Sequence, residues 1–219
     1  SFRDSSTSAE ITNAAGSGRI DSEGQGIGIS LTWFGHDGLY VYLSAGRDWI
    51  DVDASSEGGG MLLEGYEDAV DSASGEVGKR FTLEGGTTLV PQLQLAWSQM
   101  KNGSFTDNLG NRVTFADRET LTGRLGLSVE HDVSDAGWGT GKIYGFGNVL
   151  HDLQGEKTVR VAGTDLTNGG RGSWAELGAG FSLTTNEQSN FFGQVSYSHA
   201  IADVSGDAMS VSAGWRVRW

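Results

Sequence analysis

The sequence predicts an all-β fold, an antiparallel transmembrane β-barrel of the outer membrane, on three observations. Apolar and polar residues alternate along most of the chain, the alternating segments are long, and 35 of the 219 residues are glycine. Alternation of this kind is typical of strands with one apolar and one polar face. Because glycine lowers helix propensity wherever it occurs, we expect strands and no helical bundle.

The composition excludes several classes of protein. A formal net charge of −13 disfavours nucleic acid as a partner, since phosphates bind basic surfaces. The absence of cysteine excludes a disulfide framework and a thiolate metal site. No apolar run approaches the roughly 18 residues of a membrane-spanning helix. A polar composition still suits a membrane barrel, whose strands present only every second side chain to lipid.

Nine segments carry the alternation and are predicted to be complete strands. They are residues 24–35, 38–50, 72–83, 87–101, 118–131, 140–153, 173–183, 190–201 and 208–219. Most have 11 to 14 residues, whereas ordinary strands average about 5–6. A tilted strand needs about 9–11 residues to cross a bilayer, so length favours a membrane barrel over a soluble sandwich.

The connections between these segments alternate in length. Those at 36–37, 84–86, 132–139 and 184–189 are short, those at 51–71, 102–117 and 154–172 are long, and only the short segment 202–207 breaks the rule. Outer-membrane barrels have short periplasmic turns and long extracellular loops. We therefore expect the acidic segment 51–71 to be an extracellular loop.

The number of strands is odd, although a closed antiparallel barrel requires an even number. We expect residues 1–23, which are rich in Ser, Thr, Asp, Ala and Gly, to form an extracellular loop or the remnant of a strand ahead of the barrel domain at 24–219. The odd count also leads us to expect that N-terminal strands are missing from the chain.

Several stretches, in this order and spacing, make the chain resemble the C-terminal translocator (β) domain of bacterial autotransporters, the type V secretion family. They are Gly24-Gln25-Gly26-Ile27-Gly28 with Leu31-Thr32-Trp33, Gly38-Leu39-Tyr40-Val41, Gly75-Glu76-Val77-Gly78-Lys79-Arg80-Phe81 with Leu89-Val90-Pro91-Gln92-Leu93-Gln94-Leu95, Gly123-Arg124-Leu125-Gly126-Leu127, Asn148-Val149-Leu150-His151-Asp152-Leu153, and Gly214-Trp215-Arg216-Val217-Arg218-Trp219. The resemblance implies a 12-stranded barrel with a helix in its pore, of which this chain would hold strands four to twelve.

The same resemblance implies the function. The barrel would anchor in the outer membrane of a Gram-negative bacterium and help to export an N-terminal passenger, with outer-membrane lipid, the barrel-assembly machinery and the passenger as partners. The last residues resemble the assembly signal of such barrels, in which Gly214, Val217 and the terminal aromatic Trp219 are the matching positions. An unpaired terminal strand can add to an open sheet edge, which gives that signal a physical basis.

The polar face of the predicted strands supplies the candidate pore lining. These residues are Glu76, Arg80, Gln92, Gln94, Arg124, Glu130, Glu176, Gln194, Arg216 and Arg218. Charges in a lumen stay hydrated, whereas an arginine on the lipid face costs roughly 2–4 kcal/mol at the midplane. We expect a polar conduit or a seat for the pore helix, with glycines on the same face letting the strands bend or leaving room for an internal segment.

Two other classes remain open: a ten-stranded outer-membrane barrel acting as a surface protease or other enzyme, and a porin or adhesin. The enzyme would need residues 1–23 to supply a tenth strand, and carboxylates and histidines to converge at the outer rim. The pairs His36-Asp37, His131-Asp132 and His151-Asp152 cannot form dyads themselves, since neighbours in a strand point to opposite faces. The sequence shows no catalytic, metal or cofactor motif, and we expect no enzyme and no cofactor.

Overall fold

The computed structural model describes residues 1–13, 16–58, 60–100, 104–106, 110, 112–115, 118–133, 139–154, 156–161, 164–169, 172–186, 189–202 and 205–217. The described strands are β1 (Phe2–Asn13), β2 (Gly16–Phe34), β3 (Leu39–Ser56), β4 (Gly60–Lys79), β5 (Phe81–Thr82), β6 (Thr87–Met100), β7 (Ser104–Thr106), β8 (Arg112–Phe115), β9 (Arg118–Val133), β10 (Thr140–Asp152), β11 (Glu156–Val161), β12 (Thr164–Gly169), β13 (Ser173–Asn186), β14 (Ser189–Ala202) and β15 (Asp207–Val217). A 3₁₀ turn, η1 (Glu84–Gly86), precedes β6. Among these residues no helix has both the length and the apolar character to cross a membrane.

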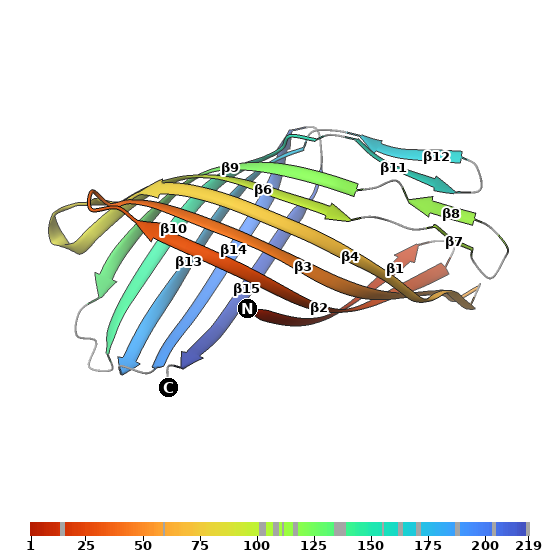
Figure 1. Cartoon of the computed structure of the whole chain (residues 1–219), viewed down its shortest axis with the longest axis horizontal. Coiled ribbons are helices and arrows are strands. Elements are labelled where there is room, and N and C mark those ends of the chain that lie inside the picture. The colour runs from red at the N-terminus through yellow and green to blue at the C-terminus, as the bar shows by residue number, and fades with distance from the viewer. Residues whose placement is uncertain are drawn as a thin grey trace.

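The long strands form one antiparallel sheet that curves into part of a barrel (Figure 1). Its order is β1-β2-β3-β4-β6-β9-β10-β13-β14-β15, and the short β5 pairs with β6 beside β4. Neighbours in this order are also neighbours in sequence apart from the short insertions, as expected for strands joined by hairpins. Within the described residues β1 and β15 form the two edges of the sheet and do not pair with each other.

The predicted all-β fold is confirmed, and all nine predicted segments are strands, but the count of nine is wrong. Residues 1–23, expected as a loop or a strand remnant, contain the complete strand β1, which pairs with β2 from Phe2 opposite Ile27 to Asn13 opposite Gly16. Alternation could not reveal β1 because its residues are mostly polar at both parities; the backbone ladder needs no apolar side chain. The ten long strands make an even number, so an odd strand count no longer supports the expectation that N-terminal strands are missing. The extracellular position of residues 1–23 stays a prediction.

The acidic segment 51–71 is also not a loop. β3 continues to Ser56 and β4 begins at Gly60, and their ladder runs from Leu39 opposite Lys79 to Ser56 opposite Gly60 with irregular register near Val52. The side chain of Asp53 accepts a hydrogen bond from the backbone N–H of Gly65 at 2.7 Å within this extension. The other two long connections hold short strands, which form a second sheet in the order β12-β11-β8-β7 beyond the same end of the wall (Figure 1).

The distribution of side chains is the reverse of that in a soluble protein. Among the residues whose burial the structure describes, the buried apolar side chains are Val90, with 1% of its surface exposed, and Ala200, whereas the buried polar ones are Thr88, Ser128, Asn148, Asp152 and Ser196. Large apolar side chains instead lie exposed on one face of the sheet, among them Ile29, Leu31, Leu43, Leu93, Leu95, Leu125, Leu127, Ile143, Val149, Leu177, Val195 and Val211. Exposure of this extent marks a surface that meets an apolar phase or partner.

Candidate functional site

The register of the strands gathers the predicted pore residues that the structure describes on the concave face of the wall. Glu76 lies opposite Gln94, and Gln94 lies opposite Arg124 on the next strand. Residues two apart along a strand share a face, so Gln92 and Glu130 lie on the face that Gln94 and Arg124 occupy. Glu176 and Gln194 follow on β13 and β14. The structure therefore brings together residues that lie up to about half the chain apart.

One network on this face centres on Glu76. The Tyr40 hydroxyl donates to Glu76 Oε1 at 2.7 Å, and Gln92 Nε2 donates to the Tyr40 hydroxyl at 2.9 Å. Arg124 Nη2 donates to the other carboxylate oxygen of Glu76. The carboxylate thus has a charged and a neutral donor, and three strands besides its own contribute to the network.

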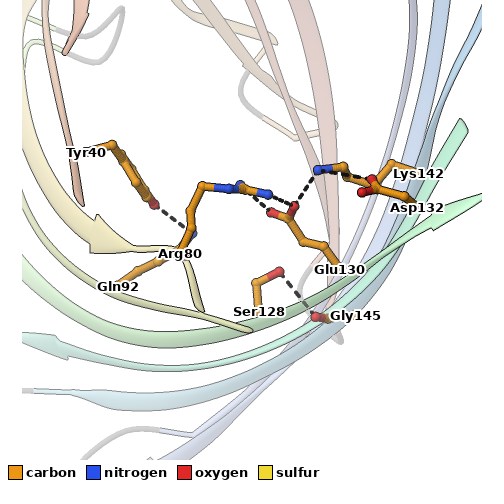
Figure 2. A network of polar contacts seen from close by, with 8 residues as sticks. All are labelled: Tyr40, Arg80, Gln92, Ser128, Glu130, Asp132, Lys142 and Gly145. Carbon is orange, nitrogen blue, oxygen red and sulfur yellow. Dashed lines mark hydrogen bonds and ion pairs between the residues drawn. The ribbon is translucent and has the colours of Figure 1, made fainter. Parts of the chain in front are cut away.

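A second network centres on Glu130 (Figure 2). Arg80, in the short break between β4 and β5, donates from Nη1 and Nη2 to the two Glu130 oxygens at 3.2 and 2.6 Å. Lys142 Nζ donates to Glu130 Oε2 at 2.7 Å and lies 3.6 Å from Asp132. Paired guanidinium and carboxylate groups of this geometry are among the stronger hydrogen bonds in proteins. The backbone N–H of Arg80 donates to the Gly38 carbonyl at 2.9 Å, which fixes the start of the side chain.

Two more contacts continue the polar surface toward β14. Asn148 Nδ2 donates to Glu176 Oε2 at 2.7 Å, and the Tyr144 hydroxyl donates to Gln194 Oε1 at 3.1 Å. Tyr144 and Asn148, like Tyr40 and Lys142, were not among the predicted residues. They lie on β3 and β10, strands from which no pore residue was predicted, and their even positions, opposite the alternate positions that hold Val41, Ile143 and Val149, are the signal that could have found them.

These side chains border an open cavity of about 390 Å³ on the concave face. Three carboxylates, of Glu76, Glu130 and Glu176, and three cationic groups, of Arg80, Arg124 and Lys142, line it. Each of the carboxylates accepts a hydrogen bond from another lining side chain. The lining thus carries equal numbers of carboxylates and cationic groups; Glu76 and Glu130 are paired with cations, and Glu176 bonds the neutral amide of Asn148.

The C-terminal strand lies at the far edge of the wall. Gly214 lies opposite Phe192, whose ring comes within 2.2 Å of the position that a Cβ on Gly214 would occupy. Val217 is the last residue of β15 and lies opposite Ser189, and Arg216 lies opposite Asn190 on the concave side. Arg218 and Trp219 lie outside the described residues.

The histidines do not converge. His131 Nδ1 lies 3.1 Å from the Thr87 hydroxyl, His151 Nδ1 lies 2.8 Å from the Ser173 hydroxyl, and His199 pairs with Asp207. Each contact joins two adjacent strands at a different place in the sheet. In the described part of the chain no three His, Cys, Asp or Glu side chains are grouped so as to hold a metal ion. The tenth strand that the enzyme alternative required is present as β1, but the required cluster at the rim is not found in the described residues.

A curved antiparallel sheet with an apolar convex face and a charged concave face defines the wall of a membrane β-barrel. The family model described as the autotransporter beta-domain matches residues 1–196. The chain therefore belongs to the autotransporter β-domain family.

Curated relatives and solved structures agree with this assignment. The chain is 29% identical over 222 residues to the adhesin BmaC autotransporter of Brucella suis, covering 97% of this chain and 6% of the relative. It is 29% identical over 206 residues to the pertactin autotransporter of Bordetella bronchiseptica, covering 93% of this chain and 22% of the relative. The chain thus spans a small part of the length of these relatives.

The fold matches two solved autotransporter structures. The transport unit of AIDA-I from Escherichia coli matches with a TM-score of 0.78 at 17% identity, over all of this chain and 73% of that one. The β-domain of the Bordetella autotransporter BrkA matches with a TM-score of 0.70 at 18% identity, over all of this chain and 92% of that one. At these identities the likeness concerns the fold.

Proposed function

We propose that this chain forms the wall of an outer-membrane barrel that anchors an autotransporter in a Gram-negative bacterium and helps its N-terminal passenger to reach the cell surface. The observation that supports the proposal is that apolar side chains are exposed on the convex face while charged side chains lie on the concave face. Leu93 and Leu125 are exposed on the convex face, where lipid would cover them, while Glu76 and Glu130 are paired on the concave face. A polypeptide crossing beside the concave face would meet water and paired charges.

The residues predicted to line the pore act together in this proposal. A charge that is already paired within the wall attracts an oppositely charged segment of a passing polypeptide less than an unpaired charge does. Coulomb attraction between unit charges at 4 Å is about 4 kcal/mol at an effective dielectric constant of 20, so an unpaired lumen charge would retain oppositely charged passenger segments. Pairing by Arg80 and Arg124 lowers that retention.

Export is tested with an epitope-tagged passenger fused ahead of the β-domain in a Gram-negative host. Intact cells are treated with a protease that does not cross the outer membrane. We expect the epitope to be digested while a periplasmic marker protein stays intact. An epitope that is protected in intact cells and digested only after lysis would refute the export function.

The assembly machinery is the second partner that we propose, with β15 as the strand that it recognises. Val217→Asp places a charge at the apolar end of the strand, and we expect it to reduce the amount of barrel in the outer membrane severely. Ser210→Asp changes the polar face of the same strand and serves as the matched control. Equal membrane levels of the two variants would contradict the role of Val217.

A further inference from the structure

Three rows of the sheet share one arrangement on the concave face. In each row a glycine lies on the middle strand, and the strands on either side carry polar side chains directly opposite it. The rows are Arg3, Gly26 and Asp48 on β1, β2 and β3; Tyr40, Gly78 and Gln92 on β3, β4 and β6; and Tyr144, Gly180 and Gln194 on β10, β13 and β14.

In every row the two outer side chains bond to each other across the glycine. The Tyr144 hydroxyl donates to Gln194 Oε1 at 3.1 Å, and Gln92 Nε2 donates to the Tyr40 hydroxyl at 2.9 Å. In the row that begins at β1, Arg3 Nε and Nη2 donate to the two oxygens of Asp48 at 2.9 and 2.8 Å. Backbone ladders join only neighbouring strands, whereas these contacts join strands that are two places apart.

The glycine makes the contact possible. A Cβ on Gly180 would lie 2.5 Å from the Tyr144 hydroxyl oxygen, and a Cβ on Gly78 would lie 2.6 Å from that of Tyr40. On Gly26 it would lie 1.9 Å from Asp48 Oδ1. Any side chain at these positions would occupy the space that the bridging group now fills. The bridging side chains therefore fill the space above these three glycines, so of the two roles that the sequence analysis offered, bending of the strands fits these positions and room for an internal segment does not.

We propose that these three strand-skipping ties hold the inward curvature of the wall. Neighbouring strands lie about 4.8 Å apart, so strands two places apart lie about 9.6 Å apart in a flat sheet. A hydrogen bond on the concave side favours bending, because it holds the inward side chains of the two outer strands together while the backbone spacing stays fixed. The wall keeps its curvature although β1 and β15 are not paired with each other in the described part.

Two ion pairs act in the same direction without a glycine. Glu76–Arg124 and Arg80–Glu130 both extend from the β4–β5 side to β9 across β6. This inference concerns the shape of the wall and does not depend on whether the wall exports a passenger.

Distance measurement between two spin labels tests the proposal on the 219-residue chain in detergent micelles. The chain has no cysteine, so Val77→Cys and Val195→Cys introduce the only labels. These positions lie on β4 and β14, and their side chains are 40% and 41% exposed on the convex face. The tie between Tyr144 and Gln194 lies within the arc that the labels span.

Tyr144→Phe removes the hydroxyl and keeps the ring over Gly180. We expect the distance distribution to shift to longer values and to broaden, and Gln194→Leu to reproduce the change from the other end of the tie. Ser98→Ala is the matched control, because the Ser98 hydroxyl bonds that of Thr120 at 2.7 Å between the neighbouring strands β6 and β9. Distributions that stay unchanged in both tie variants, or an equal shift in Ser98→Ala, would overturn the proposal.

Discussion

Glu130→Gln tests how strongly the paired charges on the concave face stabilise the wall. The Glu130 side chain is only 16% exposed and accepts hydrogen bonds from Arg80 and Lys142, which are 33% and 34% exposed. The amide keeps the size of the carboxylate but removes its charge, which leaves two cations on the wall with Asp132 as the nearest carboxylate to Lys142. The variant separates loss of charge from loss of volume.

The expected destabilisation follows from the number and exposure of these contacts. A hydrogen bond to a charged group contributes about 1.5–3 kcal/mol, and the partial exposure of the two cations reduces their share, so we expect a loss of about 2 kcal/mol for Glu130→Gln. Asp132→Asn is the control, since Asp132 is 65% exposed and lies 3.6 Å from Lys142; exposed pairs contribute about 0–1 kcal/mol.

The assay is unfolding by guanidinium in lipid vesicles, followed by the fluorescence of the seven tryptophans. We expect the unfolding midpoint of Glu130→Gln to fall clearly below that of the wild type and the midpoint of Asp132→Asn to stay close to it. Equal midpoints for the two variants would refute the argument that burial and the number of donors determine the strength of these pairs.

Three further outcomes are expected. Gly180→Ala should destabilise the wall by about 1–3 kcal/mol through overpacking, because its Cβ would lie 2.5 Å from the ring of Tyr144. Gly145→Ala should be tolerated, since the nearest atom to its Cβ would lie at 3.7 Å. Equal unfolding midpoints of the two variants would contradict this. The Lys79 ammonium, with a backbone N–H, holds the pKa of Asp37 in the turn after β2 below its ordinary value. This contact therefore stabilises the fold above the unfolded-state pKa, and the stabilisation is lost as the pH falls through the lower folded-state pKa. Lys79→Met should raise the Asp37 pKa measured by carboxyl NMR, and an unchanged pKa would show that Lys79 is not the cause. Leu125→Arg, at a side chain 65% exposed on the convex face, should cost about 2–4 kcal/mol of unfolding free energy in vesicles, and wild-type stability would argue against lipid at that position.

The sequence predicted the parts of the fold that depend on alternation. β9 shows this well: Leu125 and Leu127 fall on the exposed apolar face, and Arg124 and Glu130 on the concave one. β1 was missed because its polar residues give no difference between faces. The part of the β3–β4 hairpin that continues past Arg47 and Asp71 was missed for the same reason. Backbone pairing extends these strands beyond the segment in which one face is apolar.

The candidate site was predictable as a surface but not as a network. Parity alone placed Glu76 and Arg124 on one face, while their pairing depends on the register of three strands, which no local pattern specifies. Tyr40 was missed because only glutamate, arginine and glutamine residues were taken as pore lining, although its ring lies over Gly78 on the concave side. Which side chain fills the space above a glycine depends on the register of the neighbouring strand, and the sequence does not show that register.

The most direct test of the whole account is a scan of single spin labels along β9 from Leu121 to Glu130 in lipid vesicles. Oxygen concentrates in the acyl chains, and a polar nickel chelate stays in water. Our account predicts that odd positions such as Leu125 and Leu127 are relaxed by oxygen, and that even positions such as Gly126 and Ser128 are relaxed by the chelate. Equal access of the chelate to both sets would contradict it, because the convex face would then lie in water.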